Sequence, residues 1–572
     1  MDNQRLLVWA AFGMMIWFTY QAWMEDYGPK PVPQVAEQAE QAEETAPAAT
    51  EDLSLPELGD DTAAPGEAPG GSLPGDPEPT SAPRDDTVRV VTDVLDVEIS
   101  LRGGTLVQAT VLGYPVEKDR PDELVQLLSP ERSELGLIRT GLRSAVGDSP
   151  SHSSLFTAGK ETFDLGNADE VVVPLSWEDG NGLYVEKRLT FSRGSYAIGI
   201  EQTVRNATTE PWRGDQYTQL LRRSREQERS MFNVASYSFD GPITYDGDKS
   251  EKIDRGDLIK KGPVEYATAD GWVGAIQHHF LSAIVPDAEA QHIFRVEISN
   301  DTTIASVVGA KQTVEAGESH TFTRTLYVGP KLQAQLGELH ERLKLTVDYG
   351  WLTILSQPMF WLLAFIYQYV GNWGVAIIGV TILIKLVFYK LTESSGRSMA
   401  KMRNLQPRMK ALQERYKDDR QQLSQQMMEL YKREQVNPAA GCLPILVQMP
   451  FFLAFYWVLV ESVEMRQAPF ALWITDLSAR DPYFVLPLIM GAAMLMQQKL
   501  NPAPADPVQA RVMQIMPIMF TGFFAFFPSG LVLYWSTNTI LSIAQQWKIN
   551  KVVEKEAKQK KGSKKNKKQK DS

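Results

Sequence analysis

One charged residue interrupts a long apolar run of this sequence. Lys385 lies inside the run 374–391, and Thr381 precedes it by one helical turn on the same face. Ionisable residues inside membrane spans usually face a wet cavity, where they bind an opposite charge. The alternative is snorkelling, because a lysine stem about 7 Å from the end of a span nearly reaches the headgroups. A snorkelling lysine does not need Thr381, so the pair favours a cavity that binds acidic groups transiently.

Polar residues in two other apolar runs support this interpretation. Four of them share one helical face of the run 531–547: Tyr534, Asn538, Ser542 and Gln545. Gln448 interrupts the run 443–460. Ordinary hydrogen bonds between helices explain one or two such residues. A buried lysine together with a stripe is better explained by a hydrated surface between spans.

Signatures of enzymes and metal sites are missing from the sequence. The single cysteine, Cys442, excludes a disulfide framework and a multi-thiolate zinc site. There is no HExxH, Walker A or GxGxxG motif. The pair His278-His279 is a weak metal candidate, and surface or core histidines are more common. We therefore expect no enzymatic activity, no cofactor and no metal, and the net charge of −12 argues against DNA binding.

The elements that position these residues are apolar runs of membrane length. The predicted spans lie within 1–24, 374–391, 443–460, 483–498, 512–527 and 531–547. The run 351–370 is long enough to cross as well. If it crossed, the basic segment 392–442 would lie outside, against the positive-inside rule. We therefore expect 351–370 to be an interfacial helix, and six spans with both termini in the cytoplasm.

The first span is expected to be an uncleaved anchor, because bulky aromatics occupy the place of a signal-peptide cleavage site. Residues 28–86 hold eleven Pro and fourteen acidic residues without an aromatic, which predicts a disordered tether. From Val88 to about Val328, apolar and polar residues alternate between turn clusters. This pattern predicts a large antiparallel β-sandwich outside the cytoplasm.

Charged residues dominate two segments that we place in the cytoplasm. The stretches 398–415 and 421–434 have helical periodicity and are separated by a polar turn, which predicts a helical hairpin. Residues 548–572 hold eleven Lys and suit binding to anionic lipid or ribosomal RNA, or a plain topology signal.

The run 512–527 makes only about 24 Å of helix, which would thin the bilayer locally and ease the passage of polar chain.

Several ordered motifs closely resemble the YidC membrane-protein insertases of Gram-negative bacteria. They are Gly371-Asn-Trp-Gly374, Ser398-Met-Ala-Lys-Met-Arg403, Leu405-Gln-Pro407, Val436-Asn-Pro438, Gly441-Cys442, Gln448-Met-Pro450, Arg466-Gln-Ala-Pro-Phe-Ala-Leu-Trp473 and Phe527-Pro-Ser-Gly-Leu-Val-Leu-Tyr534. The resemblance covers nearly the whole chain apart from the tether and tail.

This resemblance implies a multi-domain membrane protein, with six transmembrane helices, five of them a conserved core, and a periplasmic all-β supersandwich. The expected domains are 1–24 anchor, 25–86 tether, 87–345 supersandwich, 346–370 interfacial helix, 371–391 second span, 392–442 cytoplasmic hairpin, 443–547 third to sixth spans and 548–572 tail. The family's groove cation aligns with Lys385, where many members carry Arg, and its groove threonine aligns with Thr381. Its substrate-contacting aromatics align with Phe523 and Trp535, the latter in place of a Tyr in some members.

We therefore predict an inner-membrane insertase and chaperone without ATP chemistry. The expected substrate-binding residues are Lys385, Thr381, Gln448, Phe523, Tyr534, Trp535 and Asn538. Expected partners are nascent inner-membrane proteins, the Sec translocon, membrane lipids and, through the tail and cytoplasmic loops, the ribosome. An ion-coupled transporter with Lys385 as its coupling site is the alternative, although no inverted repeat is visible. An enzyme is a further alternative, because the supersandwich that the resemblance implies is a fold also found in sugar-modifying proteins. No acid–base pair for such chemistry can be identified in the sequence.

Overall fold

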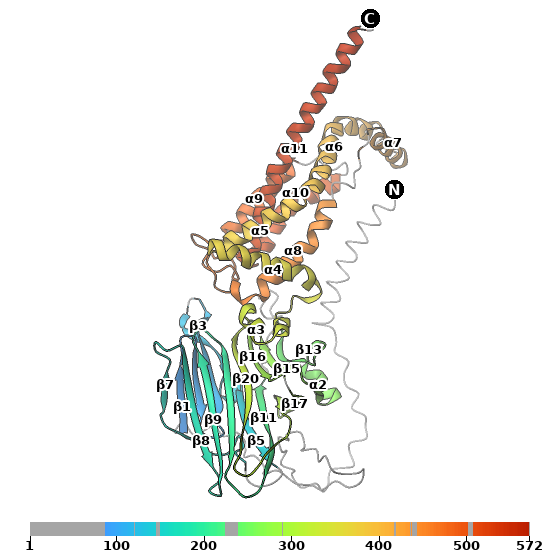
Figure 1. Cartoon of the computed structure of the whole chain (residues 1–572). Coiled ribbons are helices and arrows are strands. Elements are labelled where there is room, and N and C mark those ends of the chain that lie inside the picture. Colours follow the sequence, from blue (N-terminus) through green and yellow to red (C-terminus); the bar gives the residue numbers. More distant parts are fainter. Residues whose placement is uncertain are drawn as a thin grey trace, which may run out of the picture.

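The computed structural model describes residues 86–570 except for 119, 145–148, 224–237, 289, 417–418, 435, 437–442 and 501–506. The predicted anchor 1–24 and nearly all of the tether 25–86 lie outside these residues. The described chain forms a β domain followed by a bundle of helices (Figure 1). This division confirms the predicted combination of an all-β domain with a helical core.

Two sheets make up the β domain. The eleven-stranded sheet contains β14 (Val264–Thr268), β17 (His292–Ser299), β18 (Thr302–Val308), β11 (Trp212–Arg223), β5 (Gly136–Ser144), β3 (Thr105–Glu117), β2 (Leu95–Ser100), β1 (Thr87–Val91) and β7 (Thr162–Asp164) in spatial order, with β19 (Gln312–Val314) beside β11 and β4 (Arg120–Leu128) beside β3. The nine-stranded sheet contains β13 (Ser250–Lys252), β12 (Asp240–Tyr245), β15 (Trp272–Gln277), β16 (Phe280–Pro286), β20 (Ser319–Pro330), β10 (Ala197–Asn206), β9 (Leu183–Ser192), β8 (Glu170–Glu178) and β6 (Thr157–Ala158).

Strand periodicity explains how the two sheets pack. Along β9 the side chains alternate between buried and exposed, and those of its neighbour β10 do the same. The period of two directs one face of each strand into the core. The strand pairs are antiparallel among the described residues, except that β1 runs parallel to β7. Three short helices lie in or after the sheets: η2 (Arg132–Glu134), α2 (Arg255–Lys261) and α3 (Gln333–Leu339).

The helical part begins after α3. Its elements are η4 (Glu341–Thr346), η5 (Gly350–Leu352), α4 (Thr353–Val370), α5 (Trp373–Val387), α6 (Tyr389–Arg415), α7 (Arg420–Arg433), α8 (Leu443–Glu461), η7 (Val463–Met465), α9 (Val485–Leu500), α10 (Pro507–Phe524) and α11 (Ser529–Lys570). Helix α4 runs across the end of the bundle that faces the β domain, while α6 and α7 lie at the opposite end (Figure 1).

Three helix ends differ from the sequence expectations. The predicted helix 374–391 is two helices, because α5 ends at Val387 and the chain bends by 68° into α6. The first hairpin helix therefore starts at Tyr389, nine residues before the predicted 398. The run 512–527 forms the helix α10, which ends at Phe524, and α11 continues without a break into the Lys-rich tail.

Helix length and hydropathy identify few independent spans among the described residues. Gly350–Val370 is the one helix that is long and apolar enough to cross a membrane by itself. Helices α5 and α6 meet the same criterion only as a bent pair, and Leu446–Glu461 and Val485–Leu500 are shorter apolar helices. The count of six spans and the interfacial placement of α4 therefore stay predictions.

A polar junction joins the β domain to the bundle. The Lys331 ammonium, after β20, lies 3.5 Å from the Glu461 carboxylate at the end of α8, and both side chains are buried. His279 hydrogen-bonds the carbonyl of Val460 through Nε2 at 2.7 Å. Next to them, Arg466 donates to the carbonyl of Pro115 at 2.9 Å. These contacts fix the β domain against the loop that follows α8.

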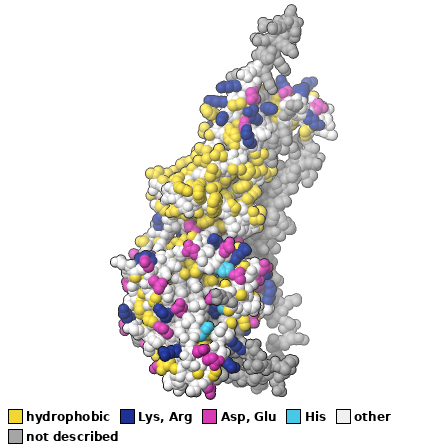
Figure 2. All heavy atoms as spheres, viewed as in Figure 1, with side chains coloured by type: hydrophobic (Ala, Val, Ile, Leu, Met, Phe, Trp, Pro, Cys, Tyr) yellow, Lys and Arg dark blue, Asp and Glu magenta, His cyan; other side chains and the backbone are white. Residues whose placement is uncertain are grey.

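Apolar side chains cover the surface of the bundle. Figure 2 shows a hydrophobic band over the helices, with charged side chains gathered on either side of it. Large exposed residues of α5, α9 and α10 contribute, including Leu386, Val387, Leu488 and Ile518, each more than 60% exposed. An apolar band bounded by charge is typical of a surface that faces lipid.

Candidate functional site

The position of Lys385 is set by the two ends of α5. Gly371, in a left-handed conformation with φ of 61°, ends α4, and the Asn372 side chain then accepts the Val375 N–H at 3.0 Å to begin α5. Lys385 lies in the last turn of α5, just before the bend at Phe388. Cations are favoured at helix C-termini by the helix dipole.

The Lys385 side chain is buried between α5 and α11. Its Nζ donates to Ser542 Oγ on α11 at 2.7 Å, and the side chain is 8% exposed. Ser542 Oγ in turn donates to the backbone carbonyl of Asn538 at 2.7 Å. Among the described residues no carboxylate forms an ion pair with Lys385. The site therefore holds a buried cation with a neutral partner.

The other polar residues of the predicted site lie on α5, α8 and α11 and do not bond to Lys385. Thr381 is 1% exposed, and its hydroxyl donates to the carbonyl of Ile377 on its own helix at 2.7 Å. Asn538 contributes its carbonyl, as described above, and its side chain is half-buried. Gln448 is half-buried on α8. The direct partner of Lys385 is thus Ser542, which belongs to the predicted polar stripe but was not among the expected substrate-binding residues.

The predicted aromatic residues fall into two environments. Tyr534 is 3% exposed, and its ring stacks on Phe455 of α8 with centroids 4.5 Å apart. Trp535 packs edge-on against Phe452 at 4.7 Å. Phe523, by contrast, is 56% exposed on α10. The structure therefore assigns Tyr534 and Trp535 to an aromatic cluster between helices and Phe523 to the outer surface.

The two adjacent histidines belong to the polar junction. The rings of His278 and His279 stack with centroids 3.7 Å apart. Burial lowers the pKa of His278 to about 3, and burial together with His278 holds the pKa of His279 well below its usual value. The described residues contain no group of three His, Cys, Asp or Glu side chains placed to hold a metal ion. The contact of His279 with the Val460 carbonyl places the pair where the β domain meets the bundle.

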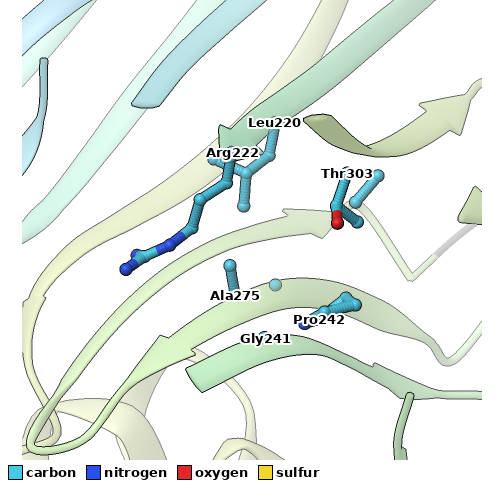
Figure 3. Close-up of a pocket in the computed structure, with 8 residues that line it drawn as sticks. Leu220, Arg222, Gly241, Pro242, Ala275 and Thr303 are labelled. Carbon is cyan, nitrogen blue, oxygen red and sulfur yellow. The ribbon is translucent and has the colours of Figure 1, made fainter. Parts of the chain in front are cut away.

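A pocket lies in the β domain. Eight residues line it, from β11, β12, β15 and β18: Leu220, Arg222, Gly241, Pro242, Gly274, Ala275, Thr303 and Ala305 (Figure 3). No carboxylate is among the lining residues, so the pocket offers no acid–base pair for sugar chemistry.

The α6–α7 hairpin has an apolar seam of its own. The buried residues Leu405 and Met409 of α6 pack against Leu430 of α7. Arg408 and Glu434 add an ion pair at 2.8 Å. The base of α6 is held separately, because Arg397 bonds Glu556 on α11 at 3.1 Å.

Comparison with known proteins gives consistent matches over the whole described chain. Residues 365–557 match the family described as 60Kd inner membrane protein, and residues 87–362 match the YidC periplasmic domain. The membrane protein insertase YidC of Thioalkalivibrio sulfidiphilus is 45% identical, over 98% of this chain and 100% of the relative. That of Nitrosococcus oceani is 44% identical, over 97% and 100%. A crystal structure of an active YidC insertase matches at 18% identity and a TM-score of 0.39, covering 81% of this chain and 92% of the other.

Proposed function

Because the chain belongs to the YidC family of membrane protein insertases, we propose that it inserts newly made proteins into the bacterial inner membrane and helps them fold. The relatives are named as insertases, and their names indicate no catalytic activity. Family membership makes the chain an inner-membrane protein with a periplasmic β domain. The observation that supports the mechanism best is the buried Lys385 ammonium, which has Ser542 as its neutral partner.

In this proposal Lys385 binds the polar end of a client protein during insertion. A charged group in the middle of a membrane costs at least about 2.5–3.5 kcal/mol, and an opposite charge reduces that cost. Lys385 has no carboxylate partner among the described residues, so its charge is available to a client. Gln448 and Asn538, which are half-buried on α8 and α11, would keep the approach to Lys385 hydrated. The client's acidic tail would rest there before it moves outward.

The apolar part of the client needs a path beside this site. We propose that it moves along the lipid-exposed faces of α5 and α11, where Leu386 and Ile540 are at least half exposed. Phe523 on α10 offers a further exposed aromatic contact. Tyr534 and Trp535 would act mainly by holding α8, α10 and α11 together.

The orientation follows from the periplasmic β domain. The α6–α7 hairpin and the far end of α11 lie at the end of the bundle opposite the β domain (Figure 1). This arrangement supports a cytoplasmic hairpin and a cytoplasmic C-terminus. The hairpin is then suited to receive clients, and the Lys-rich tail to bind ribosomal RNA or anionic lipid. A Sec translocon would work beside the insertase on clients with several spans.

An ion-coupled transporter is the rival function, with Lys385 as its coupling site. The family assignment and the long α6–α7 hairpin favour the insertase, because a coupling site alone requires no such hairpin.

Reconstitution tests the proposed function directly. The purified chain in protein-free liposomes would receive a single-spanning client whose translocated tail carries one Asp, with insertion scored by protease protection. We expect insertion by the wild type, a loss of about tenfold with Lys385→Ala and a greater loss with Lys385→Glu. Lys390→Ala is the matched control, since it removes an exposed charge just beyond the bend. Equal insertion by all variants would reject the role of Lys385, and no insertion above empty liposomes would reject an autonomous insertase.

A further inference from the structure

Ser542 makes two hydrogen bonds with one hydroxyl group. A hydroxyl has a single proton to donate and lone pairs that accept. The Asn538 carbonyl can only accept, so the proton of Ser542 points to it at 2.7 Å. The lone pairs of Ser542 are thereby left for the Lys385 ammonium, also at 2.7 Å. The direction of both bonds is therefore fixed by the chemistry of the three groups.

The surrounding helices hold Ser542 at this position. Three residues further along α11, Gln545 donates to the carbonyl of Tyr389 at 3.3 Å, just beyond the α5–α6 bend. Towards the start of α11, Gly530 lies beside the Ile377 side chain of α5, since a Cβ there would be in ordinary van der Waals contact with Cδ1 at 3.5 Å. Contacts before and after Ser542 thus fix α11 against α5.

A lysine needs such a partner more than an arginine does. Its ammonium is a compact charge at the end of a flexible stem of four carbons, whereas a guanidinium is planar and rigid. Without a fixed acceptor, the Lys385 side chain is free to turn towards the headgroups. Ser542 holds it in the bundle instead.

The neutrality of Ser542 is as important as its position. An Asp or Glu at this position would form an ion pair and cancel the charge that a client's carboxylate must find. The ammonium carries three N–H groups. Ser542 takes one of them, and no other described protein group is bonded to the remaining two. Ser542 therefore orients the charge and leaves it available.

We propose that Ser542 is a positioning residue, which holds the Lys385 ammonium between α5 and α11 so that it selects clients with an acidic translocated tail. This inference rests on the proposed insertase function. It predicts that Ser542 affects the preference for acidic over neutral tails, whereas a purely structural residue would affect both kinds of client equally.

The test compares two isosteric substitutions with two clients in the liposome assay. Ser542→Thr keeps the hydroxyl and Ser542→Val removes it, and the clients differ only by Asp or Asn in the tail. We expect Ser542→Thr to insert both clients as the wild type does. Ser542→Val should insert the Asp client about tenfold less and the Asn client normally. Thr539→Val is the control, because Thr539 makes the same kind of bond to its own helix, to the Trp535 carbonyl, without touching Lys385.

A second substitution gives an independent result. Ser542→Asp should abolish the preference for the Asp client while leaving the Asn client inserted, because the new carboxylate neutralises Lys385. The proposal would be overturned if Ser542→Val reduced the insertion of both clients equally. It would also be overturned if Ser542→Asp still inserted the Asp client in preference to the Asn client. In both cases the wild type still inserts. If the wild type itself inserts neither client above empty liposomes, the insertase function fails instead.

Discussion

Lys187 is a buried cation in the β domain that the insertion mechanism does not use. It is fully buried on β9, and its ammonium donates to the carbonyls of Gly103 and Thr140 at 2.5 and 3.0 Å. It also lies 4.9 Å from the centre of the Phe156 ring. Burial lowers the pKa of Lys187 to about 7. Above that pH the folded domain holds a neutral amine.

This residue makes the stability of the β domain depend on pH. Between pH 7 and the ordinary lysine pKa of 10.5, the unfolded chain binds a proton at Lys187 that the folded chain does not. The free energy of unfolding therefore rises with pH in this range, by at most about 1.4 kcal/mol per pH unit. Lys187→Met should flatten this rise. Amide exchange of β9 in the full-length protein, corrected for intrinsic rates, would measure it. The exposed Lys160→Met serves as the control, and an unchanged slope in Lys187→Met would contradict the assignment.

The residues of the candidate site were predictable from sequence to different degrees. Lys385 and Thr381 stand out because charge and polarity are rare in apolar runs. The polar stripe in the run 531–547 identified one face of that helix. It could not identify which residue of the stripe contacts α5, because helical periodicity shows which residues share a face but not which of them meets a neighbouring helix. Whether Phe523 or Tyr534 is exposed depends on packing between helices, which no local pattern encodes.

At the scale of elements, the base of the hairpin is fastened to α11. Gly396 on α6 allows close packing, because a Cβ there would lie 2.8 Å from the side chains of Gln546 and Ile549. Ala400 packs against Ile549 and Val553 nearby. The half of the hairpin near α5 is therefore tied to the last helix.

Gly396→Val should separate the two helices, because overpacking of this kind costs about 1–3 kcal/mol, equivalent to about 5- to 150-fold in the equilibrium constant for closing the contact. A Cys pair at positions 400 and 553, in a background with Cys442→Ser, would report the contact by its rate of disulfide formation. Gly522→Val is the control, since no atom lies within 4 Å of a Cβ there. Crosslinking as fast in Gly396→Val as in its parent would show that the contact is not required.

Elements were predictable where the pattern is local. Period-two alternation between Val88 and about Val328 predicted an antiparallel β domain, because a strand that packs on one face shows its period directly. The order of the strands was not predictable, since β11 pairs with β5 and β18, far away in sequence. The early start of α6 was missed because the prediction continued the apolar helix to 391, whereas the chain bends at Phe388.

For the whole molecule, the polar junction determines how the β domain is held over the bundle. The Lys331 and Glu461 side chains are 1% and 11% exposed. Removing one partner of such a pair leaves a buried charge, which costs about 3–5 kcal/mol, whereas replacing both is often neutral. Lys331→Met should therefore lower the thermal stability of the full-length protein in detergent, and Lys331→Met with Glu461→Met should restore most of it.

The exposed pair Arg120–Glu123 provides the comparison for this experiment. Its atoms approach to 2.6 Å, but both side chains are about half exposed, so Arg120→Met should change the thermal stability much less than Lys331→Met does. A double variant at the junction that is no more stable than Lys331→Met would indicate that the ion pair itself contributes stability.

The length of α11 has a mechanical consequence. Its 42 residues make a continuous rod of about 63 Å, of which Ser542 lies about 20 Å from the β-domain end. If that end acts as a pivot, a displacement at the tip is reduced to about one third at Ser542. The bond to Lys385 weakens once its 2.7 Å length grows by about 1 Å, which a sideways movement of about 3 Å at the tip would produce. A large partner bound to the tail would therefore change the orientation of the Lys385 ammonium by moving α11. The contact between α6 and α11 would resist that movement.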